Sequence, residues 1–393
     1  MDGNLAKGGR VIVVGGGFAG LSIAARLSQT GLPVTLLEAT QLGFESSTRN
    51  QGWLHSGALH ALDHPDLARM CYAALQQTLA YCPECLEPDH DGMYYILCQS
   101  ETAPESWTDA WSASGIPARA VPLDEIGKSL PGFERANARH AFLLPDRSFQ
   151  PGLLLESLAR TARQHGTEIL TQTPVYELVQ DNGRVNGVQL GSGEVIHGQF
   201  VILAAGTMSH GRLSATMTEC CGEQSSFTRV YLKTHLVAVK PGLSRVPFCI
   251  ADAGGFNHLP HSQTSVFGGN RWRPVSSGTD LHVEPEETEQ IWSQIHRFFP
   301  EFDRQECSGV TEWAGITVQA MQVDQIVPGD APLPAVIDHS RESPYYEGLL
   351  TVHPGRATLW PQVAEQVRSI VLKRMSSQSS IDSAQPPPWE ANV

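Results

Sequence analysis

The sequence predicts an α/β protein with two domains, one built on a parallel β-sheet covered by helices and a second, β-rich domain of α+β type. Three observations support this fold class. An apolar strand, a glycine-rich turn and a helix follow one another near the N-terminus, and a second run of helix and strands starts near residue 150. The regions after each of these runs consist mainly of strand-like segments. A chain of 393 residues is long enough for about two domains.

The composition argues against several classes of partner. The chain has 27 basic and 41 acidic residues, which gives a formal net charge of −14. Nucleic acid or an anionic membrane would require a basic face, whereas one arginine can hold a small anionic substrate. No apolar run reaches the roughly 18 residues of a membrane span, and no signal peptide precedes the first strand. Because the eight cysteines show no disulfide spacing either, we expect a cytoplasmic protein.

The first βαβ unit is RVIVVGGGFAGLSIAARLSQTGLPVTLLEA. Val11–Val14 are a continuous apolar run, which is typical of a central strand in a parallel sheet. Residues 22 to 28 have helical periodicity, and Val34–Leu37 form the second strand. The unit is therefore expected to be of the Rossmann type.

The turn of this unit carries a dinucleotide-binding motif. Gly15, Gly17 and Gly20 fit GxGxxG between the strand and the helix, and Glu38 ends the next strand. The first glycine permits the tight turn, the second lets a pyrophosphate approach the helix N-terminus, and the third allows close packing of helix on strand. Glu38 can accept hydrogen bonds from both ribose hydroxyls. Because strand, helix and acid occur in register, the motif predicts a bound dinucleotide.

The second α/β segment follows residue 150. QPGLLLESLARTARQHG is an amphipathic helix with Pro151 at its start and Gly166 at its end. Short strands come next, and Asn182 and Gly183 are typical of a hairpin turn between two of them.

The choice between FAD and NAD depends on the last strand of this segment. It ends in Ala204, Ala205 and Gly206, which are small enough to lie against a bound cofactor. This ending resembles the late FAD motif of flavoprotein oxidoreductases, and no second GxGxxG is present for a nicotinamide domain. We therefore expect FAD, in a glutathione-reductase-like domain.

The domain organisation follows from these segments. Strand-like runs such as MYYILC and RVYLKTHLVAV interrupt the nucleotide-binding segments, and the C-terminal tail is polar and proline-rich. We expect a discontinuous FAD-binding domain over residues 1–92, 141–224 and 331–375, a substrate domain over residues 93–140 and 225–330, and a disordered tail over residues 376–393.

Most of the chain resembles the D-amino acid oxidase and glycine oxidase superfamily of FAD enzymes. The resemblance rests on GGGFAG, SLPGF, FQPGLLLESLARTARQHG, NGRVNGV, LAAGTMS, WAGITVQ and HPGRATLWP. Within that superfamily, TRNQGWLHSGALH followed by DLARMC is similar to L-2-hydroxyglutarate dehydrogenases and more loosely to glycerol-3-phosphate dehydrogenases.

The resemblance implies a set of site residues. In such enzymes the loop of small residues passes the flavin, and Arg49 and Asn50 are expected to donate hydrogen bonds to it. His55 is expected beside the reacting centre as a base or substrate contact, with a packing role as the alternative, and covalent attachment of FAD to a histidine here stays open. The predicted cofactor contacts are Gly15, Gly17, Phe18, Ala19, Gly20, Glu38, Ala39, Thr48, Arg49, Asn50, Gln51, Gly52, Trp53, Val175, Ala204, Ala205, Gly206, Gly315, Gly355, Arg356, Ala357 and Thr358.

The chain departs from the family pattern at the substrate. Relatives usually read WxGxRP, with the arginine on the substrate carboxylate, whereas this chain has Thr317 in the place of that arginine. Arg356 precedes a C-terminal helix, where its charge can support the negative charge of a reduced flavin. His258 and Arg271 are the predicted substrate contacts, and no metal site is predicted.

The predicted function is an FAD-dependent oxidoreductase that removes a hydride from a carbon bearing OH or NH, as a 2-hydroxy acid dehydrogenase or oxidase does. Its small substrate is expected to carry a carboxylate, and its electron acceptor to be oxygen or a quinone. The alternatives are an amine oxidase like sarcosine, glycine or D-amino acid oxidases, and an FAD-binding protein without catalysis. The sequence does not indicate the oligomeric state.

Overall fold

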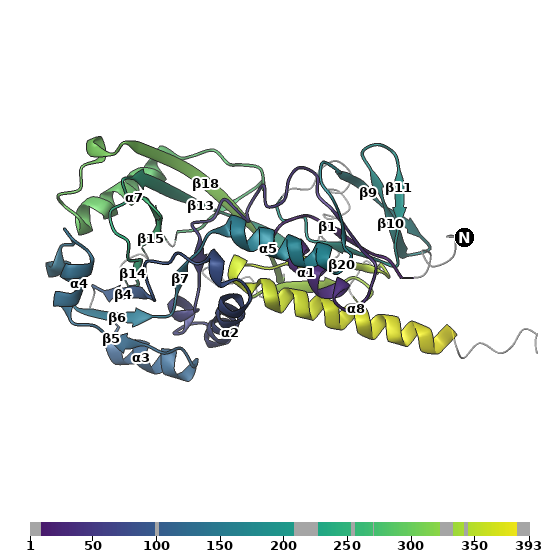
Figure 1. Ribbon diagram of the computed structural model, residues 1–393, viewed down its shortest axis with the longest axis horizontal. Coiled ribbons are helices and arrows are strands. Elements are labelled where there is room, and N and C mark those ends of the chain that lie inside the picture. The colour runs from purple at the N-terminus through teal and green to yellow at the C-terminus, as the bar shows by residue number, and fades with distance from the viewer. Residues whose placement is uncertain are drawn as a thin grey trace, which may run out of the picture.

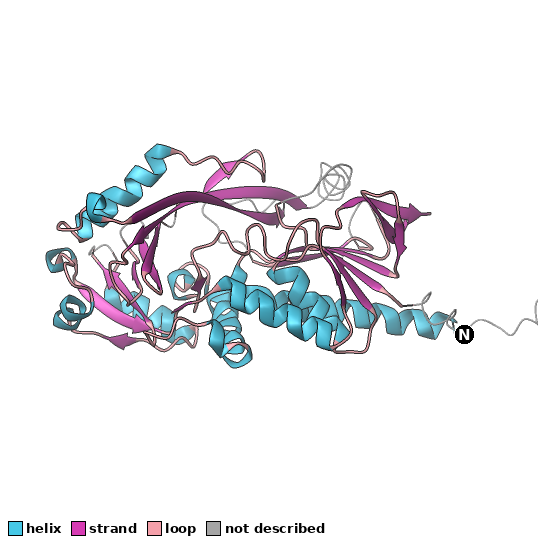
Figure 2. Ribbon diagram, turned by 45° about the horizontal axis from the view of Figure 1, so that its top comes forward, coloured by secondary structure: helices cyan, strands magenta, loops and turns pink. Residues whose placement is uncertain are grey.

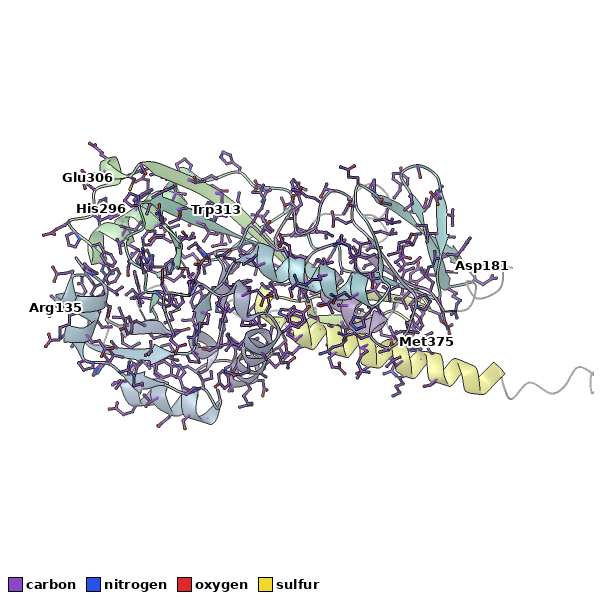
Figure 3. All side chains as sticks on the ribbon, in the orientation of Figure 1. Arg135, Asp181, His296, Glu306, Trp313 and Met375 are labelled. Carbon is purple, nitrogen blue, oxygen red and sulfur yellow. The ribbon has the colours of Figure 1, made fainter. Side chains whose placement is uncertain are left out.

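The computed structural model describes residues 9–98, 102–207, 227–252, 256–269, 271–322, 333–341 and 345–382. It contains two large sheets, one toward each end of an elongated molecule (Figure 1). Asp181 and Met375 lie at one end, and Arg135 and His296 lie at the other (Figure 3).

The first sheet has six strands in the order β19-β20-β12-β1-β2-β8. All neighbouring pairs are parallel except β19 with β20. This is the predicted Rossmann-type sheet, and both strands of the predicted βαβ unit have the expected bounds. The strands are β1 (Val11–Val14), β2 (Val34–Leu37), β8 (Glu168–Leu170), β12 (Phe200–Leu203), β19 (Ala335–Asp338) and β20 (Leu349–His353).

The two faces of β1 pack against different layers, which explains why the strand is apolar at every position. Val11 and Val13 lie in a core formed with three helices along one side of the sheet (Figure 2). Ile12 and Val14 lie in a second core, on the side of a three-stranded sheet. The helices are α1 (Phe18–Ser28), α5 (Pro151–Gln164) and α8 (Trp360–Asp382), and the small sheet is β9 (Val175–Asp181), β10 (Arg184–Leu190) and β11 (Val195–His197).

The predicted hairpin turn between β9 and β10 is confirmed. Asn182 and Gly183 have φ angles of 48° and 77°, and both values are positive as the commonest two-residue hairpin turn requires.

The second large sheet has nine strands and forms the β-rich region. Its longest pair is β13 with β18, antiparallel from Phe227↔Gln322 to Lys240↔Gly309. The strands are β4 (Met93–Leu97), β5 (Arg119–Ala120), β6 (His140–Leu144), β13 (Phe227–Lys240), β14 (Phe248–Ile250), β15 (Asn257–His261), β16 (Thr264–Gly268), β17 (Arg273–Val275) and β18 (Gly309–Gln322). The helices α3 (Pro104–Ala113), α4 (Leu123–Ser129) and α7 (Pro285–Phe298) belong to this region.

The remaining described elements are a two-stranded ladder, one helix and short 3₁₀ helices. A two-stranded ladder pairs β3 (Trp53–Leu54) with β7 (Arg147–Ser148), and α2 (Pro65–Tyr81) follows the first of these strands. The short 3₁₀ helices are η1 (Ala58–His60), η2 (Pro83–Cys85), η3 (Arg135–Asn137), η4 (Arg304–Glu306) and η6 (Ala357–Leu359).

Two of the predicted boundaries differ from the observed elements. The boundary at residue 140/141 falls inside β6, which pairs with β4 and β5 and so belongs to the β-rich sheet. The start of the tail predicted over residues 376–393 is helical, because α8 continues to Asp382. Residues 383–393 lie outside the described part of the chain, so the rest of that prediction is not tested.

Candidate functional site

One continuous cavity of about 980 Å³ runs from the glycine-rich turn to the β-rich sheet. Its first end lies where β1, β2 and β12 finish, at their carboxyl ends, which is where open α/β sheets bind their ligands. Its other end is walled by residues of β13 and β18. A single cavity therefore joins the predicted cofactor motif to the predicted substrate domain.

The glycine-rich turn requires glycine for reasons visible in the structure. Gly15 has a φ of +109°, and a Cβ there would lie 2.4 Å from the carbonyl oxygen of Ala204. A Cβ on Gly20 would lie 1.8 Å from the carbonyl oxygen of Gly15, which explains the third glycine of the motif. Gly20 thus packs the helix on the turn and does not line the cavity.

Glu38 lies at the end of β2 and lines the cavity. Its Oε2 accepts a hydrogen bond from Gly16 N at 2.7 Å, and its Oε1 accepts from Thr40 N at 2.8 Å and from Thr40 Oγ1 at 3.0 Å. A carboxylate offers about four acceptor sites, so it retains capacity for a further donor. Its position and chemistry fit recognition of a ribose hydroxyl.

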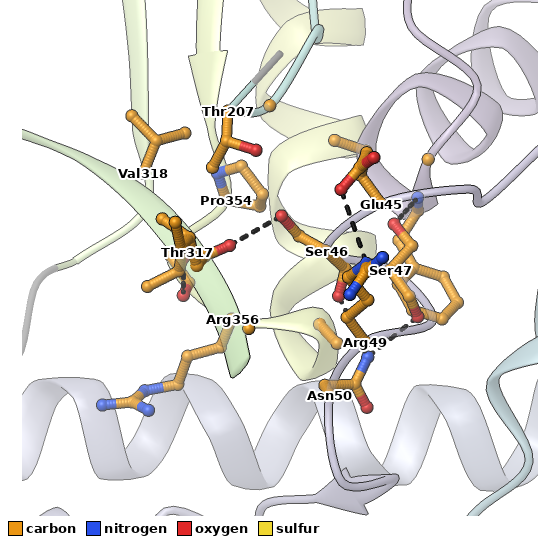
Figure 4. Close-up of a pocket in the computed structure, with 18 of the residues that line it drawn as sticks. Glu45, Ser46, Ser47, Arg49, Asn50, Thr207, Thr317, Val318, Pro354 and Arg356 are labelled. Atoms are coloured by element: carbon orange, nitrogen blue, oxygen red, sulfur yellow. Dashed lines mark hydrogen bonds and ion pairs between the residues drawn. The ribbon is translucent and has the colours of Figure 1, made fainter. Parts of the chain in front are cut away.

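The loop of small residues folds across the start of α1. Ser47 Oγ accepts from Phe18 N at 3.1 Å, and Ser46 Oγ donates to the Ile316 carbonyl of β18 at 2.7 Å (Figure 4). Arg49 pairs with Glu45, with Nε and Oε2 3.6 Å apart. The loop therefore connects the cofactor turn to the β-rich sheet.

The Asn50 amide is used inside this loop. Its Nδ2 donates to the carbonyl oxygens of Ser46 and Ser47, and its Oδ1 accepts from Gly52 N. Asn50 therefore shapes the loop, and its amide is not available as the predicted donor to the flavin in this conformation.

His55 lies toward the other end of the cavity. Its ring stacks on Trp53 at a centroid distance of 4.1 Å and an interplanar angle of 23°, and its backbone N donates to Thr358 Oγ1 at 3.0 Å. His55 Nδ1 is buried without a hydrogen-bond partner. Burial first, and the nearby Arg356 guanidinium second, hold the pKa of His55 well below 6.5. The ring is therefore a neutral imidazole at neutral pH, able to accept a proton.

Arg356 supplies the positive charge at this end. Its side chain extends over a helix, away from the Ser46–Arg49 loop (Figure 4), and its charge acts on Cys71 of α2. Its Nε is buried without a partner, and no acidic side chain of the described residues pairs with it. His60 lies close by, with its ring centroid 6.3 Å from that of His55 and its Nε2 also buried and unpartnered. Burial lowers the pKa of Arg356, but a guanidinium stays charged.

The wall formed by β13 follows the alternation of a β-strand. Val230, Leu232, Thr234 and Leu236 face the cavity. The residues between them face away, and the buried Lys233 ammonium pairs with Glu284 at 2.9 Å and Asp280 at 3.2 Å. The wall is mostly apolar, with one hydroxyl at its centre.

The structure does not place the two predicted substrate contacts at the cavity. His258 is fully buried in the β-rich core, its ring 5.0 Å from those of Phe248 and Phe267, and Nε2 lies 2.7 Å from Ser265 Oγ. Burial lowers its pKa to about 3. Arg271 is largely exposed and lies 3.9 Å from Glu287. The strand alternation of β15 turns His258 into the core, which the sequence pattern alone did not show.

Most of the predicted cofactor contacts line the cavity. The exceptions are Gly20, Thr48, Gly52 and Thr358. Thr48 Oγ1 donates to the Gly43 carbonyl, and Gly52 has a φ of +71° where a Cβ would meet the His261 ring. These residues shape the loops around the cavity, and direct contact of the others with FAD stays a prediction.

Several cavity residues were not predicted. Ser46, Ser47, His60 and Gln319 line the cavity, and Gln319 Oε1 is buried without a partner. The two serines belong to a run of small residues that signalled close approach to a ligand. Gln319 lies on β18 after Gly315, and because residues 315–319 all line the cavity, no alternation in the sequence singled it out.

The donor set and the space fit FAD. A cavity of about 980 Å³ is at the upper end of the range for ligand sites, roughly 300–1,000 Å³, as a dinucleotide requires. The glycine turn at Gly15 and the start of α1 fit a pyrophosphate. The Glu38 carboxylate fits a ribose. A Rossmann-type sheet whose cofactor cavity continues into a mostly apolar chamber with a few polar side chains is typical of a dinucleotide-dependent oxidoreductase.

The chain belongs to the DAO family of FAD dependent oxidoreductases, whose family model matches residues 10–343. One component of the anaerobic glycerol-3-phosphate dehydrogenase of Escherichia coli (strain K12) is 30% identical over 202 residues, which cover 50% of this chain and 37% of that protein. The chain thus matches little more than a third of that dehydrogenase component. Glycine oxidase of Pseudomonas aeruginosa is 28% identical over 317 residues, covering 78% of this chain and 82% of the oxidase.

Solved structures share the fold. Glycine oxidase from Geobacillus kaustophilus superposes with a TM-score of 0.73 at 20% identity, covering 93% of this chain and 95% of that one. Glycerol-3-phosphate dehydrogenase from Bacillus halodurans, complexed with FAD, has a TM-score of 0.67 at 15% identity and covers 94% of this chain and 65% of that one. The predicted fold class is confirmed, as is the predicted membership of a superfamily of FAD-dependent oxidoreductases. Across the described ranges, no helix is both long and apolar enough to cross a membrane.

Proposed function

We propose that this FAD-dependent oxidoreductase acts on a small anionic substrate and removes a hydride from a carbon that bears OH or NH. A 2-hydroxy acid is the leading substrate class. Bound FAD would supply the redox chemistry by accepting the hydride. The protein would bind the anion, orient the C–H bond and take the proton of the OH or NH group.

The observation that carries this proposal is the set of unpartnered nitrogen atoms at one end of the cavity. His55 Nδ1, His60 Nε2 and Arg356 Nε are all buried without hydrogen-bond partners among the described residues. Buried polar atoms are normally paired, and a buried cation without an ion pair is costly. A ligand with a carboxylate or similar anion would satisfy Arg356, which can bind it through two parallel hydrogen bonds.

The neighbouring residues divide the remaining tasks. The lowered pKa of His55 keeps its imidazole neutral at neutral pH, so it can accept the proton of the substrate hydroxyl or amine. The apolar side chains of β13 would exclude water from the substrate, and Thr234 would offer it one hydroxyl. At the opposite end, Gly15, the start of α1 and Glu38 would hold the pyrophosphate and ribose of FAD.

Amine oxidation is the second candidate. The match to the Pseudomonas aeruginosa glycine oxidase extends over 78% of this chain, which is a longer match than that to the glycerol-3-phosphate dehydrogenase. A neutral histidine serves an amine substrate as well as an alcohol. The electron acceptor, oxygen or a quinone, is a prediction in both cases.

The test is reduction of the bound FAD under anaerobic conditions, followed by its visible absorbance. The panel contains 2-hydroxy acids, amino acids, N-methylated amines and glycerol 3-phosphate, each carboxylic acid with its methyl ester as a matched control that lacks the carboxylate charge. We expect rapid bleaching by an acid and little by its ester, with a keto acid and no ammonia as products. Equal rates for acids and esters would contradict an anionic substrate, and release of ammonia or a primary amine would select the amine oxidase.

A further inference from the structure

Asp146 is a buried carboxylate on the turn between β6 and β7, outside the cavity. Its side chain is fully buried. Oδ1 accepts hydrogen bonds from Trp53 Nε1 at 2.8 Å, Ser56 N at 3.0 Å and the Tyr95 hydroxyl at 3.2 Å. Oδ2 accepts from the Ser56 hydroxyl. No basic side chain of the described residues pairs with it, so hydrogen bonds alone compensate its burial.

Two of these donors flank His55 in the chain. The Trp53 indole is fixed at its Nε1 by Asp146, and the His55 ring stacks on that indole at 4.1 Å. Ser56 is held by both its backbone and its hydroxyl. The backbone N of His55 itself donates to Thr358 Oγ1. The segment that presents His55 is therefore fixed on both sides of the histidine.

We propose that Asp146 is a positioning residue, whose buried carboxylate orients the His55 ring toward the cavity through Trp53 and Ser56. The inference rests on the proposed role of His55. Asp146 follows β6, a strand of the β-rich sheet, and its Tyr95 contact lies on β4 of the same sheet, while Trp53 and Ser56 lie on the segment after the cofactor turn. It thus ties the sheet of the predicted substrate domain to the segment that carries the histidine.

The chemistry of the four partners explains why the residue is an acid. All four groups are donors in this arrangement, and only an ionised carboxylate is an acceptor at both oxygens. Burial raises the pKa of the Asp146 carboxyl, while the hydrogen bonds from Ser56, Trp53 and Tyr95 oppose that rise. An asparagine would offer Trp53 a neutral amide oxygen, which accepts a weaker hydrogen bond than a carboxylate, and it would present an amide group to the Ser56 hydroxyl.

Asp146→Asn is therefore the test variant, and Tyr95→Phe is its matched control. Tyr95→Phe removes one hydrogen bond from the same carboxylate but leaves the contacts to Trp53 and Ser56. We expect Asp146→Asn to retain FAD and to slow FAD reduction roughly 10- to 100-fold, as a misplaced catalytic group does. Tyr95→Phe should reduce FAD at the wild-type rate. Equal slowing in both variants would overturn the proposal, because it would indicate general loosening of the core.

A double variant separates positioning from a merely structural effect. If Asp146 acts through His55, then Asp146→Asn combined with His55→Ala should be no slower than His55→Ala alone. The same slowing factor in the presence and absence of His55 would overturn the proposal.

A measurement without substrate keeps this inference separate from the proposed function. The indole Nε1–H resonance of Trp53, in protein labelled with ¹⁵N-tryptophan, should shift in Asp146→Asn and stay in place in Tyr95→Phe. If no compound of the panel reduces FAD, the proposed function fails while this resonance still tests the contact. An unshifted resonance in Asp146→Asn would overturn the positioning role.

Discussion

The two ends of the cavity satisfy their polar atoms in different ways. At the cofactor end, Glu38 already accepts bonds from Gly16 and Thr40, and Ser47 accepts from Phe18. At the other end, buried nitrogens of His55 and Arg356 have no partner within the described part of the chain. The polar side chains named at the cofactor end already have hydrogen-bond partners within the protein, whereas the nitrogens at the other end need a ligand as a partner.

The cofactor end is built mainly from backbone, whereas the other end is built from side chains. The cofactor end depends on close approach at Gly15 and on a helix N-terminus, which tolerate no added atoms. The other end depends on the charge and orientation of Arg356 and His55. Substitutions at the first end should therefore remove FAD, and substitutions at the second should leave FAD bound and alter its reduction.

The largest effect is expected from Gly15→Ala. The new Cβ would lie 2.4 Å from the Ala204 carbonyl oxygen, at a φ of +109° that side chains rarely adopt. The purified variant should contain little or no FAD, as judged by its absorbance near 450 nm relative to protein (on the order of a tenth of wild type or less). Gly152→Ala is the control, because that glycine of α5 faces open space and should keep full FAD. Full FAD occupancy in Gly15→Ala would show that the turn can shift without loss of the site.

A smaller effect is expected from Arg356→Ala, which should keep FAD but slow its reduction by roughly 10²- to 10³-fold if the guanidinium acts like an oxyanion-hole donor. The midpoint potential of FAD should also become more negative if Arg356 lies beside the flavin, as the sequence predicts, because the variant loses a positive charge there. Arg356→Lys should recover only part of the rate, since a point charge cannot replace the planar guanidinium.

The control for this prediction is Arg368→Ala, which removes an arginine of α8 that pairs with Glu365 at the surface. It should reduce FAD at the wild-type rate. If Arg356→Ala also reduced FAD at the wild-type rate, Arg356 would have no role in the reaction.

His55→Ala is expected to slow reduction by roughly 10²-fold, the lower end for loss of a general base. Because burial and Arg356 hold the pKa of His55 well below 6.5, the neutral base is present at pH 6.5 and above, and the loss should be seen throughout that range. Removing the charge in Arg356→Gln should raise the pKa of His55 and move the acid limb of the rate profile to higher pH. Stopped-flow reduction across pH measures both, and equal rates for wild type and His55→Ala would leave His55 a packing residue.

The same division explains what could be predicted from the sequence. The strand Val11–Val14, the glycine turn and the Asn182-Gly183 hairpin are local, since neighbouring residues fix their geometry, and all three are present as expected. The cofactor end is assembled from such segments. Its residues were therefore placed at the cavity with few exceptions.

The reacting end brings together residues far apart in the chain, and sequence patterns located it less well. His55 and Arg356 were predicted from the family resemblance, and both line the cavity. His60 was not predicted, and Asp146 acts from a turn 90 residues or more from its Trp53 and Ser56 partners. A polar residue within a strand also does not reveal which face of the sheet it occupies, which is why His258 was expected at the substrate.

The smallest effect on the reaction is expected from His258→Phe. This variant removes a histidine of the core, whereas His55→Ala removes a histidine of the cavity. A phenyl ring can take the place of His258 between Phe248 and Phe267, at the loss of one hydrogen bond to Ser265. FAD content and the rate of FAD reduction should match wild type. A rate lowered tenfold or more (on the order of 1.4 kcal/mol) with FAD still bound would return His258 to the substrate site.

The same variant should change how stability depends on pH. His258 has a pKa of about 3 in the folded protein, against the ordinary 6.5, so below pH 6.5 the unfolded chain binds a proton that the folded chain does not. Each such histidine lowers the free energy of unfolding by about 1.4 kcal/mol for every pH unit below that value. His353, whose pKa is also lowered to about 3 by burial, keeps its contribution in the variant. Urea unfolding of His258→Phe from pH 7 to about pH 5 should therefore show a shallower loss of stability than wild type, by one proton. An unchanged slope would mean that His258 binds a proton in the folded protein as readily as in the unfolded chain, which its burial between two phenyl rings opposes.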